Sequence, residues 1–502
     1  MEGHRGALTS QGWIKRANRK AEMALHEAEA LAAMAGQHPD LTHAWELVCL
    51  NQFHDVLTGT AIPEVFEDAR KDYAQVEDLT EAAAGAAAAA LAGDAPVVLN
   101  TMPLPATRFV TVEGDTDLPG QAVEGGTLLR LPDLAPYSVT PLVPDAVAAP
   151  GDAVTAAQQG DTWTLENALL RVVVGPNGQL QEVTDKARGR AVLAPGATAN
   201  ILQVFEDRPV SWDAWDIDPF FEDRCDHIDA PAKLTLVESG PLRLCLRVKT
   251  RYRDSTVTQD IILRDGSRRI DFETVVDWQE SHLLLKAAFP VDILSPMATY
   301  DIQWGQIERP THRNTTWDLA RFEVPGQMWA DLSEGDYGVA LLNDCKYGYD
   351  IHENVLRLSL IKCATMPDPQ ADKGVHRFTY SLLPHPGGLA AEVQAEAMDL
   401  NYPLRVQAPG KGGARAVQVT STAPNVIIET LKPAEDGRGL IVRFYERARQ
   451  RGPVALNFNI DVECVERCDL LEVAQETLKT DGARVTIDLN PFEIVSLRIV
   501  PK

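Results

Sequence analysis

The stretch WELVCLNQFHDVLTGTAIPEVFEDARKDY, residues 45–73, joins an apolar helical pattern to a polar pair of side chains. In its first half the apolar residues recur with the 3.6-residue period of an α-helix, and Gly59 is a helix breaker. The pattern predicts a helix over 41–56 that carries His54 and Asp55 near its end, where both can point out of a packed bundle. A neutral imidazole can bind a metal ion, and a carboxylate accepts hydrogen bonds from hydroxyl groups.

Two further helices are predicted on either side of this stretch. Residues 11–37 place small and apolar side chains on one stripe, with Thr9 or Ser10 as the N-cap. Pro63 opens an alanine-rich helix over 63–91, and proline suits a first helical turn. Three amphipathic helices joined by short loops predict a small three-helix bundle.

After Gly93 the sequence pattern changes to short segments typical of β-strands, separated by Gly, Pro, Asp and Asn. Residues 169–183 predict a hairpin around Pro176-Asn177-Gly178. The run of strands without intervening helices, and without a repeat, favours stacked β-sandwiches over a propeller or solenoid.

The predicted fold class is therefore α+β and multidomain, with a helical bundle followed by all-β sandwich domains. The boundaries fall in Gly- and Pro-rich stretches. They divide the chain into a bundle at 1–93, a small β unit at 94–150, a large β-sandwich at 151–407 and a C-terminal small β domain at 408–502.

The amino-acid composition excludes some classes of binding partner. The 502 residues carry a net charge of −25, which repels nucleic-acid phosphates and anionic lipid, so neither nucleic acid nor a membrane is an expected partner. No apolar run reaches transmembrane length. The seven cysteines are too sparse for a disulfide scaffold, and their odd number favours reduced thiols and a cytoplasmic location.

The sequence around His54 resembles a known protein family. NQFHDVLTGTAIPEVFEDA is similar to the segment Q-H/F-H-D-x-(L/I/V)-x-G-T of class II α-mannosidases, glycoside hydrolase family 38, and HRGALTSQ, from His4, resembles another family segment. The resemblance implies that His54 is a ligand of the active-site zinc and that Asp55 contacts the sugar. It also implies a galactose-mutarotase-like supersandwich in the β region.

Four sequence segments in the β region either resemble segments of the same family or place aromatic and acidic residues next to one another. Trp faces can stack on sugars and carboxylates can accept from their hydroxyls. Trp215, Asp216, Arg309 and His312 are therefore candidate substrate-binding residues, although a purely architectural role remains open for each segment. The segments are WDAWDID (212–218), IERPTHRNTTWD (307–318), LNDCKYGYD (342–350) and the stretch from His376 to His385.

The resemblance spans residues 3–502 and does not include the family's catalytic α/β barrel. The barrel's H-x-D zinc pair, aspartate nucleophile and acid/base aspartate have no counterpart, since His227-Ile228-Asp229 lies out of order. A retaining glycosidase needs two carboxyl groups, and a catalytic zinc needs about three protein ligands. No catalytic residue is therefore assigned here.

The resemblance implies the C-terminal portion of a zinc-dependent, retaining α-mannosidase that acts on terminal α-mannosyl residues of glycans. We expect the chain alone to be inactive without a barrel, which a separate chain can supply, and a homo-oligomer is compatible with the sequence. We also expect an apolar surface near His54. Two alternatives remain open: a non-catalytic carbohydrate-binding or assembly protein, and a structural relic that needs no ligand.

Overall fold

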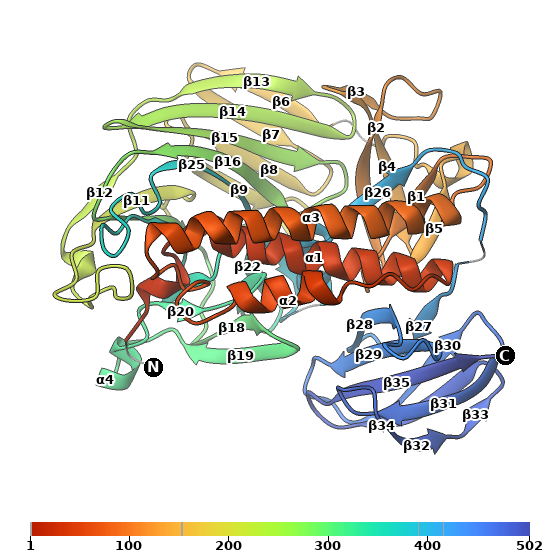
Figure 1. Cartoon of the computed structure of the whole chain (residues 1–502). Coiled ribbons are helices and arrows are strands. Elements are labelled where there is room, and N and C mark those ends of the chain that lie inside the picture. Colours follow the sequence, from red (N-terminus) through yellow and green to blue (C-terminus); the bar gives the residue numbers. More distant parts are fainter. Residues whose placement is uncertain (1–2, 152–153, 390, 415) are drawn as a thin grey trace.

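The structure, a computed structural model, describes residues 3–151, 154–389, 391–414 and 416–502. Three helices lie side by side across the β domains (Figure 1). They are α1 (Gly12–Ala35), α2 (Thr42–Asn51) and α3 (Pro63–Leu91), and the short 3-10 turn η1 (Gly6–Leu8) precedes them. Pro63 stands in the first turn of α3, as predicted.

The start of α1 differs from the prediction. Its N-cap residue is Gln11, which has a left-handed backbone at φ 52° and no side-chain capping bond. The carboxylate of Asp372 accepts hydrogen bonds from the backbone N–H groups of Gln11 at 2.5 Å and Gly12 at 2.7 Å. The predicted cap from Thr9 or Ser10 is wrong, because a distant carboxylate satisfies the free N–H groups of this helix end.

The end of α2 also differs. The helix stops at Asn51, so residues 52–56 are not helical as predicted. The Nδ2 of Asn51 donates to the carbonyl of Leu47 and to the carboxylate of Asp72, both at 2.9 Å. Asparagine side chains compete with the backbone for such bonds and disfavour helix continuation. His54 and Asp55 therefore stand in a turn after the helix.

The large β region, 155–386, contains three antiparallel sheets around one hydrophobic core. The nine-stranded sheet runs β13 (Lys233–Ser239), β14 (Arg243–Tyr252), β15 (Ser255–Arg264), β16 (Ile270–Trp278), β25 (Gly374–Pro386), β22 (Tyr337–Asn343), β21 (Trp329–Ser333), β18 (Met297–Ile302) and β19 (Gly305–Pro310). The six-stranded sheet runs β12 (Cys225–His227), β11 (Ile201–Glu206), β17 (Leu283–Pro290), β24 (Val355–Lys362), β23 (Gly348–His352) and β20 (Val324–Pro325).

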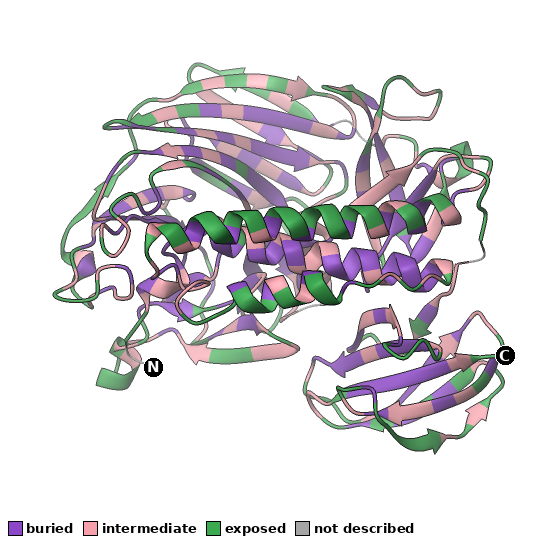
Figure 2. Ribbon diagram, viewed as in Figure 1, coloured by how far each residue is buried: buried purple, intermediate pink, exposed green. Residues whose placement is uncertain are grey.

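The third sheet of this region runs β10 (Arg190–Ala191), β9 (Leu180–Asp185), β8 (Leu170–Val174), β7 (Thr162–Glu166) and β6 (Thr155–Gln159). The pairing of β8 with β9 confirms the predicted hairpin, and Gly178 in its turn has φ +83°. Alternating apolar residues on these strands face the shared core, which Figure 2 shows as the buried interior of the sheets.

Two small sheets lie beside the helices. One runs β26 (Leu404–Gln407), β1 (Val97–Asn100) and β5 (Ser138–Pro141); the other runs β2 (Ala106–Glu113), β4 (Gly126–Leu134) and β3 (Gln121–Val123). Short helices stand at α4 (Thr316–Leu319), α5 (Ala391–Asn401), η2 (Pro144–Ala146) and η3 (Phe221–Asp223). Among the described residues, no helix has the length and hydropathy needed to cross a membrane, and the seven cysteines form no disulfide.

The C-terminal sandwich pairs a four-stranded with a five-stranded sheet. The first runs β27 (Val419–Ser421), β30 (Gly452–Phe458), β34 (Arg484–Leu489) and β33 (Thr480–Asp481); the second runs β28 (Val426–Pro433), β29 (Leu440–Glu446), β35 (Ile494–Pro501), β31 (Val462–Cys468) and β32 (Ala474–Leu478). Its core is continuous with that of the helices. The helices therefore sit between two β units and hold them together.

Candidate functional site

The turn after α2 presents His54 and Asp55, and its backbone is held by its own hydroxyl groups. The Oγ1 of Thr58 donates to the carbonyl of His54 at 2.6 Å, and the Oγ1 of Thr60 donates to the carbonyl of Asp55 at 3.3 Å. Gly59 between them has φ +82°, a conformation that glycine adopts without cost. The turn is therefore built to hold one backbone shape.

A buried lysine fastens this turn to the start of α1. The Nζ of Lys15 donates to the carbonyls of Leu57 at 2.8 Å and Ser10 at 2.5 Å. Burial lowers the pKa of Lys15 to about 7, with the charge of Asp372 opposing the shift. A Cβ on Gly59 would lie 2.3 Å from the carbonyl oxygen of Ser10, so the two backbones pack directly together.

The side chains of His54 and Asp55 point into solvent. They are 78% and 50% exposed, and His54 Nε2 lies 3.6 Å from Asp55 Oδ2. The ring of Phe53 lies 4.2 Å from the imidazole, centroid to centroid. An open imidazole beside a carboxylate has the chemistry of part of a metal site. It is only a part, because the described part of the chain holds no cluster of three or more His, Cys, Asp or Glu residues that could bind a metal.

In the loop around Trp212, Asp213 and Asp216 have different surroundings. Asp213 faces inward, where its Oδ2 accepts from the backbone N–H of Thr365 at 2.7 Å, and its Oδ1 lies 3.4 Å from His282 Nδ1. Asp216 is half-buried and accepts from the backbone N–H of His4. Asp213 is thus architectural, whereas Asp216 and Trp215 are partly open to solvent.

A second buried lysine supports the same loop. The Nζ of Lys362 pairs with the carboxylate of Asp207 and donates to the carbonyl of Asp213 at 2.8 Å. Desolvation raises the pKa of Asp207, and the nearby ammonium opposes the rise. Trp212 stands at the tip of the loop with φ +62° and packs edge-on against Trp215 at 5.7 Å between ring centroids.

The segment between His4 and Gly12 brings the two loops into one assembly. The N–H of Ala7 donates to the carbonyl of Trp215 at 3.1 Å, and the Oγ of Ser10 donates to the carbonyl of Ala214 at 2.6 Å. Ser10 also contacts the turn of His54 through Gly59. Four of the six residues predicted from the sequence, His54, Asp55, Trp215 and Asp216, therefore lie in loops braced by one segment.

Arg309 and His312 are placed differently. Arg309 lies on β19 with its guanidinium carbon 4.5 Å from the ring centroid of Tyr300, and burial lowers its pKa. Among the described residues it forms no ion pair, and its Nη1 is buried without a hydrogen-bond partner. His312 is 41% exposed, with Nδ1 3.5 Å from Asp318 Oδ2. No hydrogen bond or ion pair within the described chain joins either residue to the turn of His54.

Sequence reasoning missed Lys15, Lys362 and Asp372, which support these loops from within. Lys15 bonds carbonyls 5 and 42 residues away, and Asp372 caps a helix 360 residues away. Backbone carbonyls carry no residue-specific signal, so no motif marks such partners.

An exposed apolar surface flanks the turn of His54, as predicted. Leu50 is 63% exposed, Phe53 54% and Ile62 53%, and they stand at the end of α2 and just before α3. In the neighbouring loop Trp212 is 64% exposed. Large apolar side chains gathered in this way are typical of a surface that another protein part covers.

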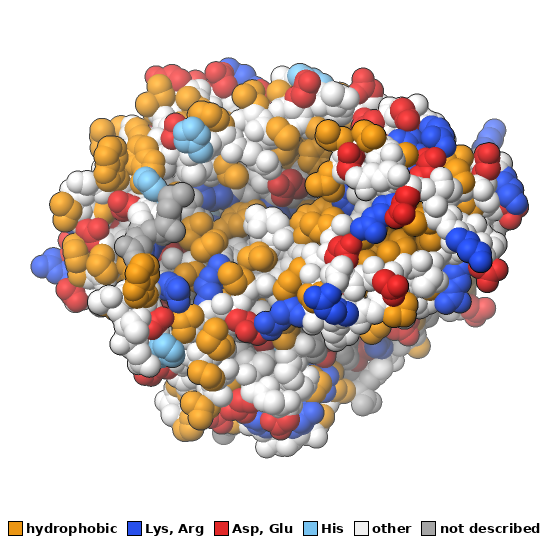
Figure 3. All heavy atoms as spheres, turned by 90° about the horizontal axis from the view of Figure 1, so that it is seen from below, with side chains coloured by type: hydrophobic (Ala, Val, Ile, Leu, Met, Phe, Trp, Pro, Cys, Tyr) orange, Lys and Arg blue, Asp and Glu red, His pale blue; other side chains and the backbone are white. Residues whose placement is uncertain are grey.

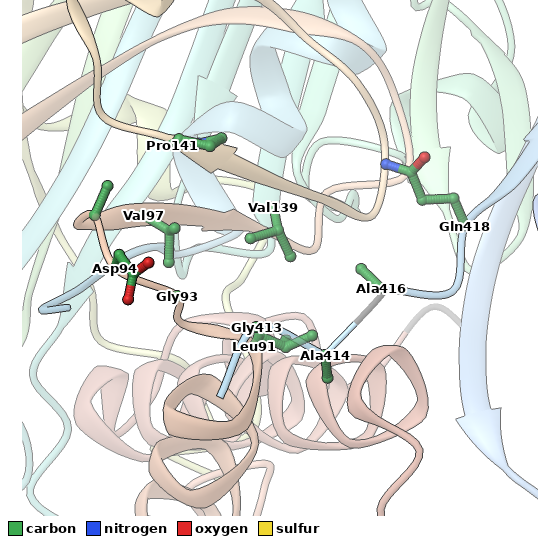
Figure 4. A pocket seen from close by; sticks show the side chains of 11 residues that line it. Leu91, Gly93, Asp94, Val97, Val139, Pro141, Gly413, Ala414, Ala416 and Gln418 are labelled. Carbon is green, nitrogen blue, oxygen red and sulfur yellow. The ribbon is translucent and has the colours of Figure 1, made fainter. Parts of the chain in front are cut away.

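A cavity of about 450 Å³ lies between the end of α3 and the two strands β1 and β5 (Figure 4), whereas the turn of His54 comes just before the start of the same helix. Small and aliphatic side chains line the cavity, together with Asp94 and Gln418. Its described lining contains none of the predicted site residues and one titratable group, the carboxylate of Asp94.

Comparison with known proteins assigns the family. Three sequence models match in chain order: the alpha mannosidase middle domain at 2–91, the glycosyl hydrolases family 38 C-terminal domain at 165–370, and the family 38 C-terminal beta sandwich domain at 425–497. The chain belongs to glycosyl hydrolase family 38. The resemblance read from the sequence is confirmed.

Two relatives of this family 38 chain carry the name α-mannosidase. Alpha-mannosidase 2C1 of Mus musculus is 36% identical over 528 residues, which cover all of this chain and 50% of the relative. Alpha-mannosidase G of Dictyostelium discoideum is 32% identical over 572 residues, covering all of this chain and 52% of the relative. The chain thus spans about half the length of the curated relatives it matches.

A solved structure shares the fold. An alpha-mannosidase from Enterococcus faecalis V583 superimposes with a TM-score of 0.80 at 19% identity, covering 98% of this family 38 chain and 68% of that chain. At this identity the likeness establishes the arrangement of helices and sandwiches, and the α-mannosidase character of the family comes from the sequence relatives.

Proposed function

We propose that this chain is the C-terminal portion of a retaining, zinc-dependent α-mannosidase that hydrolyses terminal α-D-mannosyl residues of glycans or oligosaccharides. The observation that carries the proposal is the open His54–Asp55 pair, held in a fixed turn and flanked by the exposed side chains of Leu50 and Phe53. A partial metal site beside an apolar surface has the form expected of one half of a divided active site.

The chemistry assigns limited roles to this chain. His54 would give one imidazole ligand to zinc, and Asp55 would accept hydrogen bonds from mannose hydroxyls. Zinc, when bound, would hold sugar hydroxyls in place. Trp215 and Asp216, braced next to the same segment, are proposed to contact the rest of the substrate, and Arg309 and His312 are proposed as outer contacts.

Bond cleavage needs groups beyond this chain. In a retaining glycosidase one carboxylate attacks the anomeric carbon, a carboxylic acid protonates the leaving oxygen, and water then releases the sugar from the covalent intermediate. We propose that both carboxyl groups and the remaining zinc ligands come from a catalytic barrel. The barrel would cover the apolar surface at Leu50, Phe53 and Ile62.

An activity assay tests the proposal. The chain alone should release no mannose from an aryl α-mannoside, whereas the chain together with a family 38 barrel should release it in a zinc-dependent reaction. His54→Ala should abolish that reaction. Zinc-dependent turnover by the chain alone, or full activity of the His54→Ala complex, would contradict the proposal.

A non-catalytic carbohydrate-binding or assembly role is the second candidate. The observation that favours it is the incomplete metal site, because one histidine and one carboxylate do not bind zinc tightly. Mannoside binding by the chain alone, together with inactivity in the presence of any family 38 barrel, would support this role.

A further inference from the structure

A groove of about 750 Å³ lies between α1, α2, the β18–β19 turn and the C-terminal sandwich. It opens on the lower side of the molecule in Figure 1, where α2 faces the C-terminal sandwich, and Figure 3 shows that side hollowed, with hydrophobic side chains around the hollow. Ligand sites commonly have volumes of roughly 300–1,000 Å³ and lie between domains. None of the six residues assigned above lines this groove.

Two indole side chains on its walls are fixed in position. The Nε1 of Trp45 donates to Glu29 Oε1 at 2.8 Å, which sets the orientation of that ring. Trp304 is in the two-residue turn between β18 and β19, at φ +59°, and its ring lies 5.5 Å from that of Tyr445. A bulky residue with positive φ is uncommon, because this backbone conformation favours glycine.

Three carboxylates lie on the same walls. Glu22 and Glu29 are seven residues apart on α1, so they lie two turns apart on one face, and Glu429 is on β28. In the described chain none of the three forms an ion pair with lysine or arginine. Burial raises the pKa of Glu22, against the charge of Arg19, and raises the pKa of Glu29, against the charge of Lys432.

The side chains that line the groove favour some classes of ligand over others. The described residues offer no metal cluster here. The lining holds six glutamates against Lys432 and Arg443, so its net negative charge repels phosphate and other anions. Indole faces pack against the C–H faces of a pyranose, and carboxylates accept hydrogen bonds from its hydroxyl groups. Glu22 accepts hydrogen bonds from Gln52 and Asn18, Glu29 accepts one from Trp45, and both carboxylates retain capacity for more.

We propose that this groove is a second saccharide-binding site, separate from the turn of His54 and independent of zinc, in which Trp45 and Trp304 stack on a pyranose ring while Glu29 and Glu429 bind its hydroxyls. The site would hold a remote sugar of a mannose-containing glycan. This choice of sugar rests on the proposed function, whereas the existence of the site rests on the groove alone.

Ligand-observed NMR and tryptophan fluorescence on the 502-residue chain test the proposal. We expect saturable binding of methyl α-D-mannopyranoside or α-mannobiose in the presence of EDTA. Trp304→Gly should weaken that binding by about tenfold or more. Glycine suits φ +59°, so this variant should keep the backbone of the turn, and a fall in its thermal midpoint reports the packing lost on Tyr445. Glu29→Gln should weaken binding and leave the thermal midpoint close to that of the parent.

Two controls separate this site from others. Trp317→Ala removes an indole that is 72% exposed outside the groove and should leave binding unchanged. His54→Ala should also leave it unchanged, although it should abolish hydrolysis by the complete enzyme. Binding that survives Trp304→Gly, or no binding at millimolar saccharide, would overturn the proposal.

Discussion

The buried ammonium of Lys15 donates a hydrogen bond to the carbonyl of Leu57 at 2.8 Å, which ties α1 to the turn that presents His54. The same nitrogen bonds the carbonyl of Ser10, whose hydroxyl bonds the loop of Trp215 through Ala214. One lysine therefore connects the two loops proposed to contribute to the active site.

Lys15→Met should destabilise the chain by about 3 kcal/mol, because methionine fills the space but leaves two carbonyls without their donor. The free energy of unfolding, measured in urea, checks this. Lys71→Met is the matched control, since Lys71 is 71% exposed and pairs only with Asp68 on the surface. Its effect should be close to zero, because an exposed ion pair contributes little to stability. Equal effects of the two substitutions would contradict a role for Lys15 in holding the turn.

Gly59→Ala should be clearly more destabilising than Gly36→Ala. Both glycines have positive φ, +82° and +67°, and each alanine would pay about 1–2 kcal/mol for that backbone conformation. Only the alanine at 59 also meets a neighbour, the carbonyl oxygen of Ser10 at 2.3 Å, whereas nothing lies within 4 Å at 36. Thermal unfolding of both variants gives the comparison. Similar losses would show that the turn of His54 does not pack tightly on Ser10.

The pH dependence of stability should include a contribution from Glu222. Burial would raise its pKa, but hydrogen bonding to Arg313 and the charge of Arg357 outweigh burial and lower it to about 2. Since the folded pKa lies below the ordinary value of 4.5, this contribution is present above pH 4.5 and is lost as pH falls toward 2.

Glu222→Gln should therefore flatten the acid limb of the stability curve by an amount of the order of 2 kcal/mol. Urea unfolding between pH 2.5 and pH 6 measures it. Glu67→Gln is the control, because Glu67 is exposed on α3 and forms no ion pair among the described residues. If the parent and Glu222→Gln curves run parallel, the ion pairs of Glu222 do not contribute to stability.

Phe53→Ser should leave the stability of the chain alone nearly unchanged, within about 0.5 kcal/mol, because the side chain is already 54% exposed. It should weaken association with a family 38 barrel, which gel filtration or calorimetry would detect. Val375→Ser, at a side chain 60% exposed on β25, is the control that should bind normally. Unimpaired association of the Phe53 variant would exclude this surface as the contact.

The local sequence pattern was sufficient to predict the three helices, one β-hairpin and the family. The 3.6-residue period of apolar residues located the three helices, and the Pro176-Asn177-Gly178 turn located a hairpin. The sequence motif around His54 identified family 38. These features depend on residues close together in the chain, where backbone preference and motif spacing act directly.

Tertiary contacts decided what the pattern left open. Asp372 replaces Thr9 or Ser10 as the cap of α1 from 360 residues away, and the bond of Asn51 to Asp72, 21 residues away, holds the end of α2 before His54. Asp213 is turned inward while Asp216, three residues away, stays half-open, because the partners of Asp213 come from a distant strand end. Hydrogen bonds to backbone groups hundreds of residues away leave no trace in local sequence, so the shape of the site emerges only when the chain is folded.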